Sequence, residues 1–436
     1  MDEIFIFTFA FANVDSIEGG KKVLVITSDN SAEATYSIYF DGLRKKGFDL
    51  KIALENKKVT FSKYGKFLYD QVIIFAPESE QLCNISAEDF RKFFEHGGDV
   101  VLALSNNPSK LVRTVAGDFG VDIEENGSKV IDHFNYATTS DNLDHQLVYT
   151  TQIANIKPLV GKIQDSSRVY YKGTGLVVID NIFMINTLVG EQSTYSVNNN
   201  SEITSTGKDT VMVVSVQGRN NARVSLFGSI EMFSNQYSFF VDSINAAFVK
   251  HVTFWTFRQR GILRYHDVSH KHVDNTPLEI MLKNHQRPNL PISQCDDEIS
   301  TYPEVAPNNV VYRVKDDVEY DIEIDEYSHG NWKGYNATDI QLEFRMLDPY
   351  VRINLEGENG HYHAQFKIPD VYGIYKFRVM YRRLGYSVIE SNTQVSVRPF
   401  RHNEFPRFIR AAFPYYTSVF TVMAGFIVLV ALFIFL

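Results

Sequence analysis

Four Asn-x-Ser/Thr triplets are the clearest candidates in this chain for a defined covalent modification. The asparagine of such a triplet accepts an N-linked glycan when the chain lies in a lumen. The four asparagines are Asn84, Asn126, Asn199 and Asn336. Because triplets of this kind also arise by chance in a chain rich in asparagine, they favour a lumenal location without deciding it.

Two groups of residues have side chains of types that can bind metal ions. The histidines His266, His270 and His272 have the spacing H-x3-H-x-H, and a file of acids comprises Glu319, Asp321, Glu323 and Asp325. No further ligand pattern accompanies the histidines, so we expect no zinc site. Alternate acids on one strand lie roughly 7 Å apart, too far to share one calcium ion. We expect a solvated acidic face paired with Arg345, Arg352 or Lys376.

The sequence lacks the motifs of the common catalytic and cofactor sites. It has no G-x-G-x-x-G, no P-loop and no G-x-S-x-G elbow. Its only cysteines are Cys83 and Cys295, which are too few for a disulfide framework or a zinc site. Two buried free thiols are favoured, although pairing in an oxidising lumen stays open. We therefore expect no catalytic residue, no cofactor and no metal.

The C-terminal residues 411–436 read as a transmembrane anchor. The run from Val419 to Leu436 is apolar, and eighteen residues at about 1.5 Å rise make roughly 27 Å of helix, close to a bilayer core. Tyr415 and Tyr416 precede the run, where interfacial aromatic residues anchor a helix. We expect a single span with almost all of the mass on one side of the membrane.

The N-terminus bears on which side that is. Residues 1–12 resemble a signal peptide, with an apolar stretch that closes on Ala10-Phe11-Ala12, but they carry two acids and no base before it. Cleavage there predicts a type I protein with a lumenal body. The arginines that precede the anchor favour the opposite, tail-anchored topology under the positive-inside rule. The residues alone leave both topologies open.

Composition and patterning predict two folded domains. The chain has 436 residues, 44% of them hydrophobic, and a net charge of −9 that makes nucleic acid an improbable partner. Residues 20–260 alternate compact strands with helices, which predicts a Rossmann-like or flavodoxin-like, mostly parallel α/β domain with a β extension. Its ligand crevice would lie at Thr27–Asn30, Ala76–Glu78 and Ser105–Pro108, after the strands.

The second region, residues 261–400, reads as β throughout. Six or seven segments alternate apolar and polar residues with period two, and the first runs from Val318 to Asp325. Short turns such as Asp348-Pro349 and Gly357–Gly360 separate them. This pattern predicts an antiparallel β-sandwich.

Several short sequence segments (phrases), which occur in order along nearly the whole chain, resemble characteristic segments of one family. They include Gly97–Ala103, Val130–His133, Arg219–Val224, Arg260–Arg264, Leu347–Arg352, Pro369–Gly373, Arg383–Tyr386, Ser396–Pro399 and Ala412–Tyr416. That family is the 48 kDa subunit of the oligosaccharyltransferase complex, the DDOST family. Each phrase alone is weak, whereas the ordered set is specific.

The resemblance implies a non-catalytic subunit of a protein N-glycosylation complex in the endoplasmic reticulum membrane. It implies a single-pass type I topology with a lumenal bulk, and partners that include a polytopic catalytic subunit. Contact with the dolichol-linked oligosaccharide is left open. An independent lumenal sugar-binding receptor or enzyme that uses the α/β crevice is the alternative, and a cytosolic adaptor is a further one.

One departure from the family concerns the C-terminus. Members usually continue into a short cytosolic tail, whereas this sequence ends within its apolar run at Leu436. We expect either that retention depends on assembly with partners or that the sequence is incomplete at this end.

Overall fold

The computed structural model describes residues 21–138, 145–161, 167–179, 181–240, 242–273, 311–328, 330–402, 404–405 and 410–435. The predicted signal peptide and Cys295 lie outside these residues. The chain forms two compact units. Unit 1 comprises Met1–Arg264, Asp325–Tyr335 and Arg382–Ile389, and unit 2 comprises Tyr265–Ile324, Asn336–Tyr381 and Glu390–Leu436. The domain boundaries stated from the sequence stay predictions.

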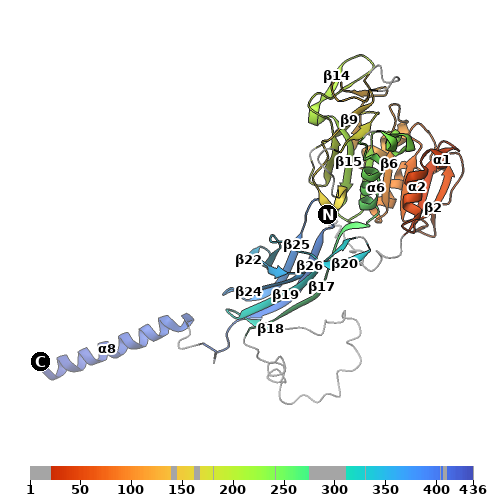
Figure 1. Ribbon diagram of the computed structural model, residues 1–436. Helices are drawn as coiled ribbons and strands as arrows, with labels where there is room; N and C mark the ends of the chain where they lie inside the picture. The colour runs from red at the N-terminus through yellow and green to blue at the C-terminus, as the bar shows by residue number, and fades with distance from the viewer. Residues whose placement is uncertain are drawn as a thin grey trace, which may run out of the picture. The chain divides into compact units, whose positions relative to one another are not determined.

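A nine-stranded mixed sheet forms the centre of unit 1 (Figure 1). Its order is β2-β1-β5-β6-β16-β15-β11-β7, and β12 also pairs with β15. The first five strands in this order run parallel, whereas β15, β11, β12 and β7 pair antiparallel. The sheet is therefore mixed rather than mostly parallel, because the predicted β extension joins the same sheet. The nine strands are β1 (Lys22–Thr27), β2 (Asp49–Leu54), β5 (Gln71–Phe75), β6 (Asp99–Ala103), β7 (Val121–Ile123), β11 (Leu176–Val178), β12 (Met184–Val189), β15 (Val211–Gln217) and β16 (Arg223–Phe227).

Helices cover both faces of this sheet, as the apolar strands predict. One core contains Val23 and Val25 of β1 with side chains of α2 and α6, and the other contains Leu24 and Ile26 with side chains of α3 and α4. At the start of α3, Ser86 and Asp89 form the predicted capping box. The helices of unit 1 are α1 (Ala32–Thr35), α2 (Ser37–Arg44), α3 (Ala87–Glu95), α4 (Lys110–Asp118), α5 (Lys157–Val160), α6 (Asn245–Thr256) and the 3₁₀ turns η2 (Gly207–Asp209), η3 (Ile230–Phe233) and η4 (Asn235–Phe239).

Small sheets complete the N-terminal part of the chain. They are built from β3 (Ser62–Lys63) with β4 (Lys66–Phe67), β9 (Val148–Thr150) with β10 (Val169–Tyr171), and β8 (Lys129–Ile131) with β13 (Tyr195–Val197) and β14 (Ile203–Thr206). All four pairings in these three sheets are antiparallel.

Two five-stranded sheets form the β-rich C-terminal part. One contains β17 (Arg260–His272), β19 (Asp317–Ser328), β20 (Asn331–Gly334), β23 (Glu356–Glu358) and β24 (His361–Lys367). The other contains β18 (Val311–Arg313), β21 (Gln341–Arg345), β22 (Pro349–Asn354), β25 (Gly373–Tyr381) and β26 (Ile389–Arg398). Buried rings from the two sheets meet: Tyr320 stacks on Phe377 at 5.3 Å between centroids, and Phe344 lies 5.3 Å from Phe366. The predicted period-two strands are present, and their apolar sides form this core.

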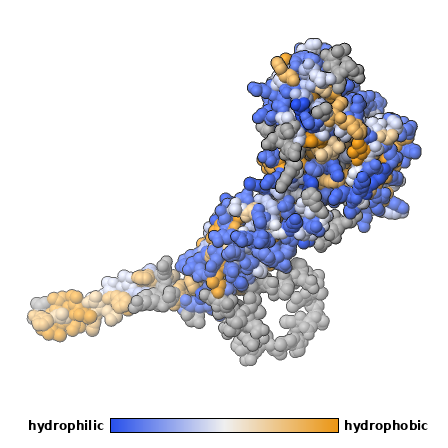
Figure 2. Space-filling model, in the orientation of Figure 1, coloured by the Kyte–Doolittle hydropathy of each residue, from blue (hydrophilic) through white to orange (hydrophobic). Residues whose placement is uncertain are grey.

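The last helix, α8 (Phe413–Phe435), follows a short 3₁₀ turn, η6 (Arg410–Ala412). It has 23 residues and a mean hydropathy of 2.7 in its most apolar window, and none of that window is buried. Figure 2 shows the hydrophobic surface that these residues present. By length and composition this helix can cross a membrane, as the sequence predicts.

Candidate functional site

A buried arginine joins three segments of unit 1 that are far apart in the sequence. Arg223, the first residue of β16, is 1% exposed, and its guanidinium donates to the carbonyl oxygens of Trp255 and Arg260, each at 2.7 Å, and of Gly261 at 2.6 Å. The end of α6 and the start of β17 supply these carbonyls. The last carbonyls of a helix have no partner inside the helix, and a cation there is favourable.

Asp99, at the start of β6, is the acid beside this arginine. Its Oδ1 accepts from the backbone N–H of Arg223 at 3.0 Å and from Arg258 Nε and Nη2 at 3.1 and 2.9 Å. Burial raises the pKa of the Asp99 carboxyl to about 6, although both arginines act in the opposite direction. Burial also lowers the pKa of Arg223, to about 9. Both terminal nitrogens of the Arg223 guanidinium therefore bind backbone carbonyls, whereas its Nε is buried without a hydrogen-bond partner among the described residues.

A loop from the C-terminal part of the chain docks on the same place. Trp255 Nε1 donates to the carbonyl oxygen of Gly385 at 2.7 Å, and Gln217 Nε2 donates to that of Tyr386 at 2.8 Å. Gly385 and Gly261 both have positive φ, and a Cβ on Gly261 would lie 2.3 Å from the Gly385 carbonyl oxygen. Only glycine fits such an approach without a shift of backbone.

We call this assembly the buried junction: Asp99, Arg223, Trp255, Arg258, Gly261 and Gly385. It unites four of the phrases that carry the family resemblance, which begin at Gly97, Arg219, Arg260 and Arg383. The sequence analysis missed it, because a charged residue in a turn-and-strand segment reads as solvated. The feature that could have indicated burial was an arginine at the start of a mostly apolar strand, between Ala222 and Val224.

The three predicted crevice loops follow β1, β5 and β6, and some of their polar groups bond to one another. Ser105 Oγ donates to Glu78 Oε1 at 3.0 Å, which ties two loops together. In the loop after β1, Asp29 Oδ1 accepts from the Ser31 backbone N–H at 2.9 Å. The hydrogen bonds from Ser31 lower the pKa of the Asp29 carboxyl. The loops form a polar edge of hydroxyls, amides and carboxylates, and these three segments contain no histidine, lysine or cysteine.

The four sequon asparagines are all exposed. Asn199 Nδ2, the atom that a glycan would modify, donates to the Asn126 carbonyl oxygen at 2.9 Å, so these two sequons lie next to each other. Asn84 has φ 63°, and the hydroxyl of its sequon, on Ser86, caps α3. Asn336 Oδ1 accepts from a backbone N–H at 2.7 Å. Occupancy at each stays a prediction.

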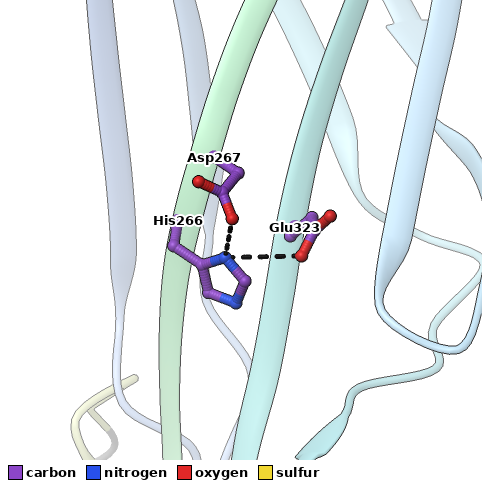
Figure 3. A group of neighbouring side chains, drawn as sticks. All are labelled: His266, Asp267 and Glu323. Atoms are coloured by element: carbon purple, nitrogen blue, oxygen red, sulfur yellow. Dashed lines mark hydrogen bonds and ion pairs between the residues drawn. The ribbon is translucent and has the colours of Figure 1, made fainter.

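The predicted H-x3-H-x-H histidines do not converge on one point in unit 2. His270 Nδ1 lies 2.7 Å from the Tyr312 hydroxyl, and His272 Nδ1 lies 3.7 Å from an Asp316 oxygen. His266 instead forms a group with Asp267 and Glu323 (Figure 3), described next.

In that group, His266 Nδ1 lies 2.8 Å from Asp267 Oδ2 and 3.4 Å from Glu323 Oε2. The other Glu323 oxygen lies 2.8 Å from His361 Nδ1. A protonated imidazole makes this an ion-paired cluster. A neutral imidazole and two carboxylates are also ligands that zinc accepts, so these residues could hold a cation. We expect no bound metal, because Asp267 is 77% exposed in its side chain and free to turn into solvent.

The predicted partners of the acidic file were wrong. Glu319 pairs with Lys271 at 3.3 Å, and Asp325 pairs with Arg264 at 3.1 Å. Arg345 and Arg352 pair instead with Glu343, at 4.0 and 2.6 Å. The reason is topological, since β19 and β21 belong to different sheets. The four acids Glu319, Asp321, Glu323 and Asp325 are half-buried rather than fully solvated.

Cys83 is a buried thiol, as expected. Its Sγ donates to the Leu54 carbonyl oxygen at 3.3 Å, and burial raises its pKa to about 11. Such a thiol is a poor nucleophile because little thiolate forms near neutral pH. Pairing with Cys295 is not tested by the described residues.

Comparisons with known proteins agree with one another. The family model "OST48, N-terminal domain" matches residues 15–259, and "OST48 middle domain" matches residues 295–436. The chain is similar to the protein named dolichyl-diphosphooligosaccharide–protein glycosyltransferase 48 kDa subunit from three organisms. It is 34% identical to that of Arabidopsis thaliana, covering 94% of this chain and 91% of the relative. For Danio rerio the identity is 35%, covering 97% and 93%, and for Drosophila melanogaster it is 35%, covering 94% and 90%. The chain therefore belongs to the OST48 family.

Proposed function

We propose that this protein is a structural, non-catalytic subunit of the oligosaccharyltransferase complex. In this role it supports transfer of a preassembled oligosaccharide from dolichyl diphosphate to asparagine in Asn-x-Ser/Thr segments of nascent proteins. The observation that carries the proposal is similarity over nearly the whole length to relatives named as the 48 kDa subunit of that glycosyltransferase.

The chemistry of the described residues supports a structural role. In the buried junction, the terminal guanidinium nitrogens of Arg223 donate to backbone carbonyl oxygens and Arg258 donates to Asp99, so these donors hold the fold together. The buried cysteine has a raised pKa, which disfavours a nucleophilic role. The crevice loops bring together hydroxyls and carboxylates, and they contain no histidine, lysine or cysteine.

We also propose the location and architecture that this role requires. The protein lies in the endoplasmic reticulum membrane as a single-pass type I protein, with residues 1–12 as a signal peptide and α8 as the anchor. The parallel strands of unit 1 form a Rossmann-like core, and the two C-terminal sheets form a sandwich over the rings of Tyr320, Phe344, Phe366 and Phe377. The partners are the other subunits, including the polytopic catalytic one.

A rescue experiment tests the non-catalytic role. Cells depleted of the protein receive the wild type or a crevice variant with Asp29→Asn and Glu78→Gln, and glycosylation of a reporter is divided by the amount of assembled complex. We expect the same activity per complex from both. Activity that falls tenfold or more with complex level unchanged would place a catalytic or donor-binding group in this chain.

A further inference from the structure

The chain ties one end of the β-rich unit to the anchor helix. β26 ends at Arg398, and both guanidinium nitrogens of Arg398 pair with Glu404, at 2.6 and 2.7 Å. The backbone N–H of Arg401 donates to the same carboxylate at 2.8 Å. From Glu404 to Phe413, where α8 begins, nine residues span at most about 32 Å. The tether therefore holds the Arg398 end of the sheet within about 32 Å of the start of α8.

Two further loops lie at this same end. β18 runs parallel to β26 with Arg313 opposite Arg398, and the turn after β18 bonds to the end of β24 through Lys315 N–H and the Ile368 carbonyl oxygen at 3.1 Å. After β24 the chain forms the β24–β25 loop, in which Asp370 pairs with Lys315 at 2.7 Å.

The β21–β22 turn is the neighbour of that loop. Arg345 at the end of β21 pairs in register with Lys376 near the start of β25. A Cβ on Gly373 would lie 2.9 Å from Met346 Cε, so the two loops are in contact. The rings of Tyr350 and Tyr375 also meet, with centroids 5.5 Å apart.

These loops expose large apolar side chains that lie outside the buried core of unit 2. The exposed fractions are Leu347 84%, Tyr372 66%, Ile374 59%, Tyr350 48% and Val371 40%. We call these five residues the anchor-side patch. Exposed cations, Lys376 and Arg401, lie on the same end. Tyrosine with aliphatic residues, flanked by lysine and arginine, is the composition that settles at the headgroup level of a bilayer.

We propose that the anchor-side patch inserts at headgroup depth into the membrane leaflet from which α8 emerges. The tether argues for the bilayer as the occupant, because it holds this end of the sheet within about 32 Å of the first residue of α8. The proposal rests on α8 spanning a membrane and is independent of assembly into the complex.

Tryptophan fluorescence in lipid nanodiscs tests the proposal on the isolated full-length chain. Leu347→Trp and Tyr372→Trp place a reporter in each loop, and the emission of the wild type, with Trp255 and Trp332, is subtracted. Phe420→Trp in α8 is the positive control. Met380→Trp, at a position 43% exposed near the far end of β25 from Gly373, is the matched control for an exposed reporter at the opposite end of the same unit.

Replacement of the lipid by its brominated form should quench both loop reporters and the α8 reporter, and leave Met380→Trp unchanged. Loop reporters that behave like Met380→Trp while the α8 reporter is quenched would overturn the proposal. A patch shielded from aqueous quenchers only after assembly with partner subunits would overturn it as well, in favour of a protein contact. An unquenched α8 reporter would remove its premise.

Discussion

Replacement of Arg223 should destabilise unit 1 strongly. In Arg223→Met the carbonyl oxygens of Trp255, Arg260 and Gly261 lose a donor, and buried Asp99 loses one of its two neighbouring cations. Breaking a buried charged network by removing one partner costs about 3–5 kcal/mol. That is a large part of the roughly 5–15 kcal/mol by which a domain is stable.

The expected shift is measurable by urea unfolding of the full-length chain in detergent. Trp255 reports on the site itself, because its ring lies 4.5 Å from the Arg223 guanidinium carbon and its Nε1 is bonded to the docked loop. With a slope of about 3 kcal/mol/M, a loss of about 4 kcal/mol moves the midpoint by about 1.3 M. Arg223→Lys should recover only part of this, because one ammonium group cannot match the planar fork of the guanidinium.

The matched control is Arg219→Met in the preceding turn. Arg219 is exposed and stacks on Phe183 at 5.5 Å, so its loss should cost less than about 0.5 kcal/mol. If Arg223→Met unfolds at the same urea concentration as Arg219→Met, the buried junction does not stabilise the fold and the reasoning is refuted.

Three further predictions concern acid stability, backbone fit and metal content. Hydrogen bonds from Arg398 lower the pKa of Glu404 from 4.5 to about 2. The stability that the Glu404 carboxylate contributes is therefore complete above pH 4.5 and is lost as the pH falls toward 2. The Tm of the wild type should then drop more steeply in acid than that of Glu404→Gln, and parallel curves would contradict this. Gly261→Ala, whose Cβ would lie 2.3 Å from a backbone carbonyl oxygen, should cost about 2 kcal/mol or more, whereas Gly117→Ala in α4, with nothing within 4 Å, should leave the unfolding midpoint unchanged or raise it. Elemental analysis of the purified protein should find zinc well below one per chain; one zinc per chain that disappears in His266→Ala would show that the cluster is a metal site.

Local patterns predicted much of the fold. Alternation in the C-terminal part identified strands such as β19 and β24, because each strand has one face on a core and one toward solvent. Continuous apolar runs such as β5 and β6 identified strands covered on both faces. The Ser86 capping box and the α8 span depend on neighbours in the sequence, so they could be predicted directly.

Long-range pairing could not be predicted in the same way. The docking of Gly385 beside Gly261 joins segments more than a hundred residues apart, and neither glycine has a local pattern that names its partner. The acids of β19 were assigned to cations of the wrong sheet, since charge alone does not specify register. The buried role of Arg223 depends on carbonyls supplied by α6 and β17, which only the folded chain brings together.

Purification of the tagged full-length protein in digitonin, with mass spectrometry of the associated proteins, tests the central claim most directly. We predict recovery of a large polytopic glycosyltransferase subunit in near-equal amount, and its loss when Phe413–Phe435 is replaced by an unrelated apolar helix of the same length. Recovery of the protein alone, stable and monodisperse, would contradict membership in the complex and favour an independent lumenal receptor or enzyme.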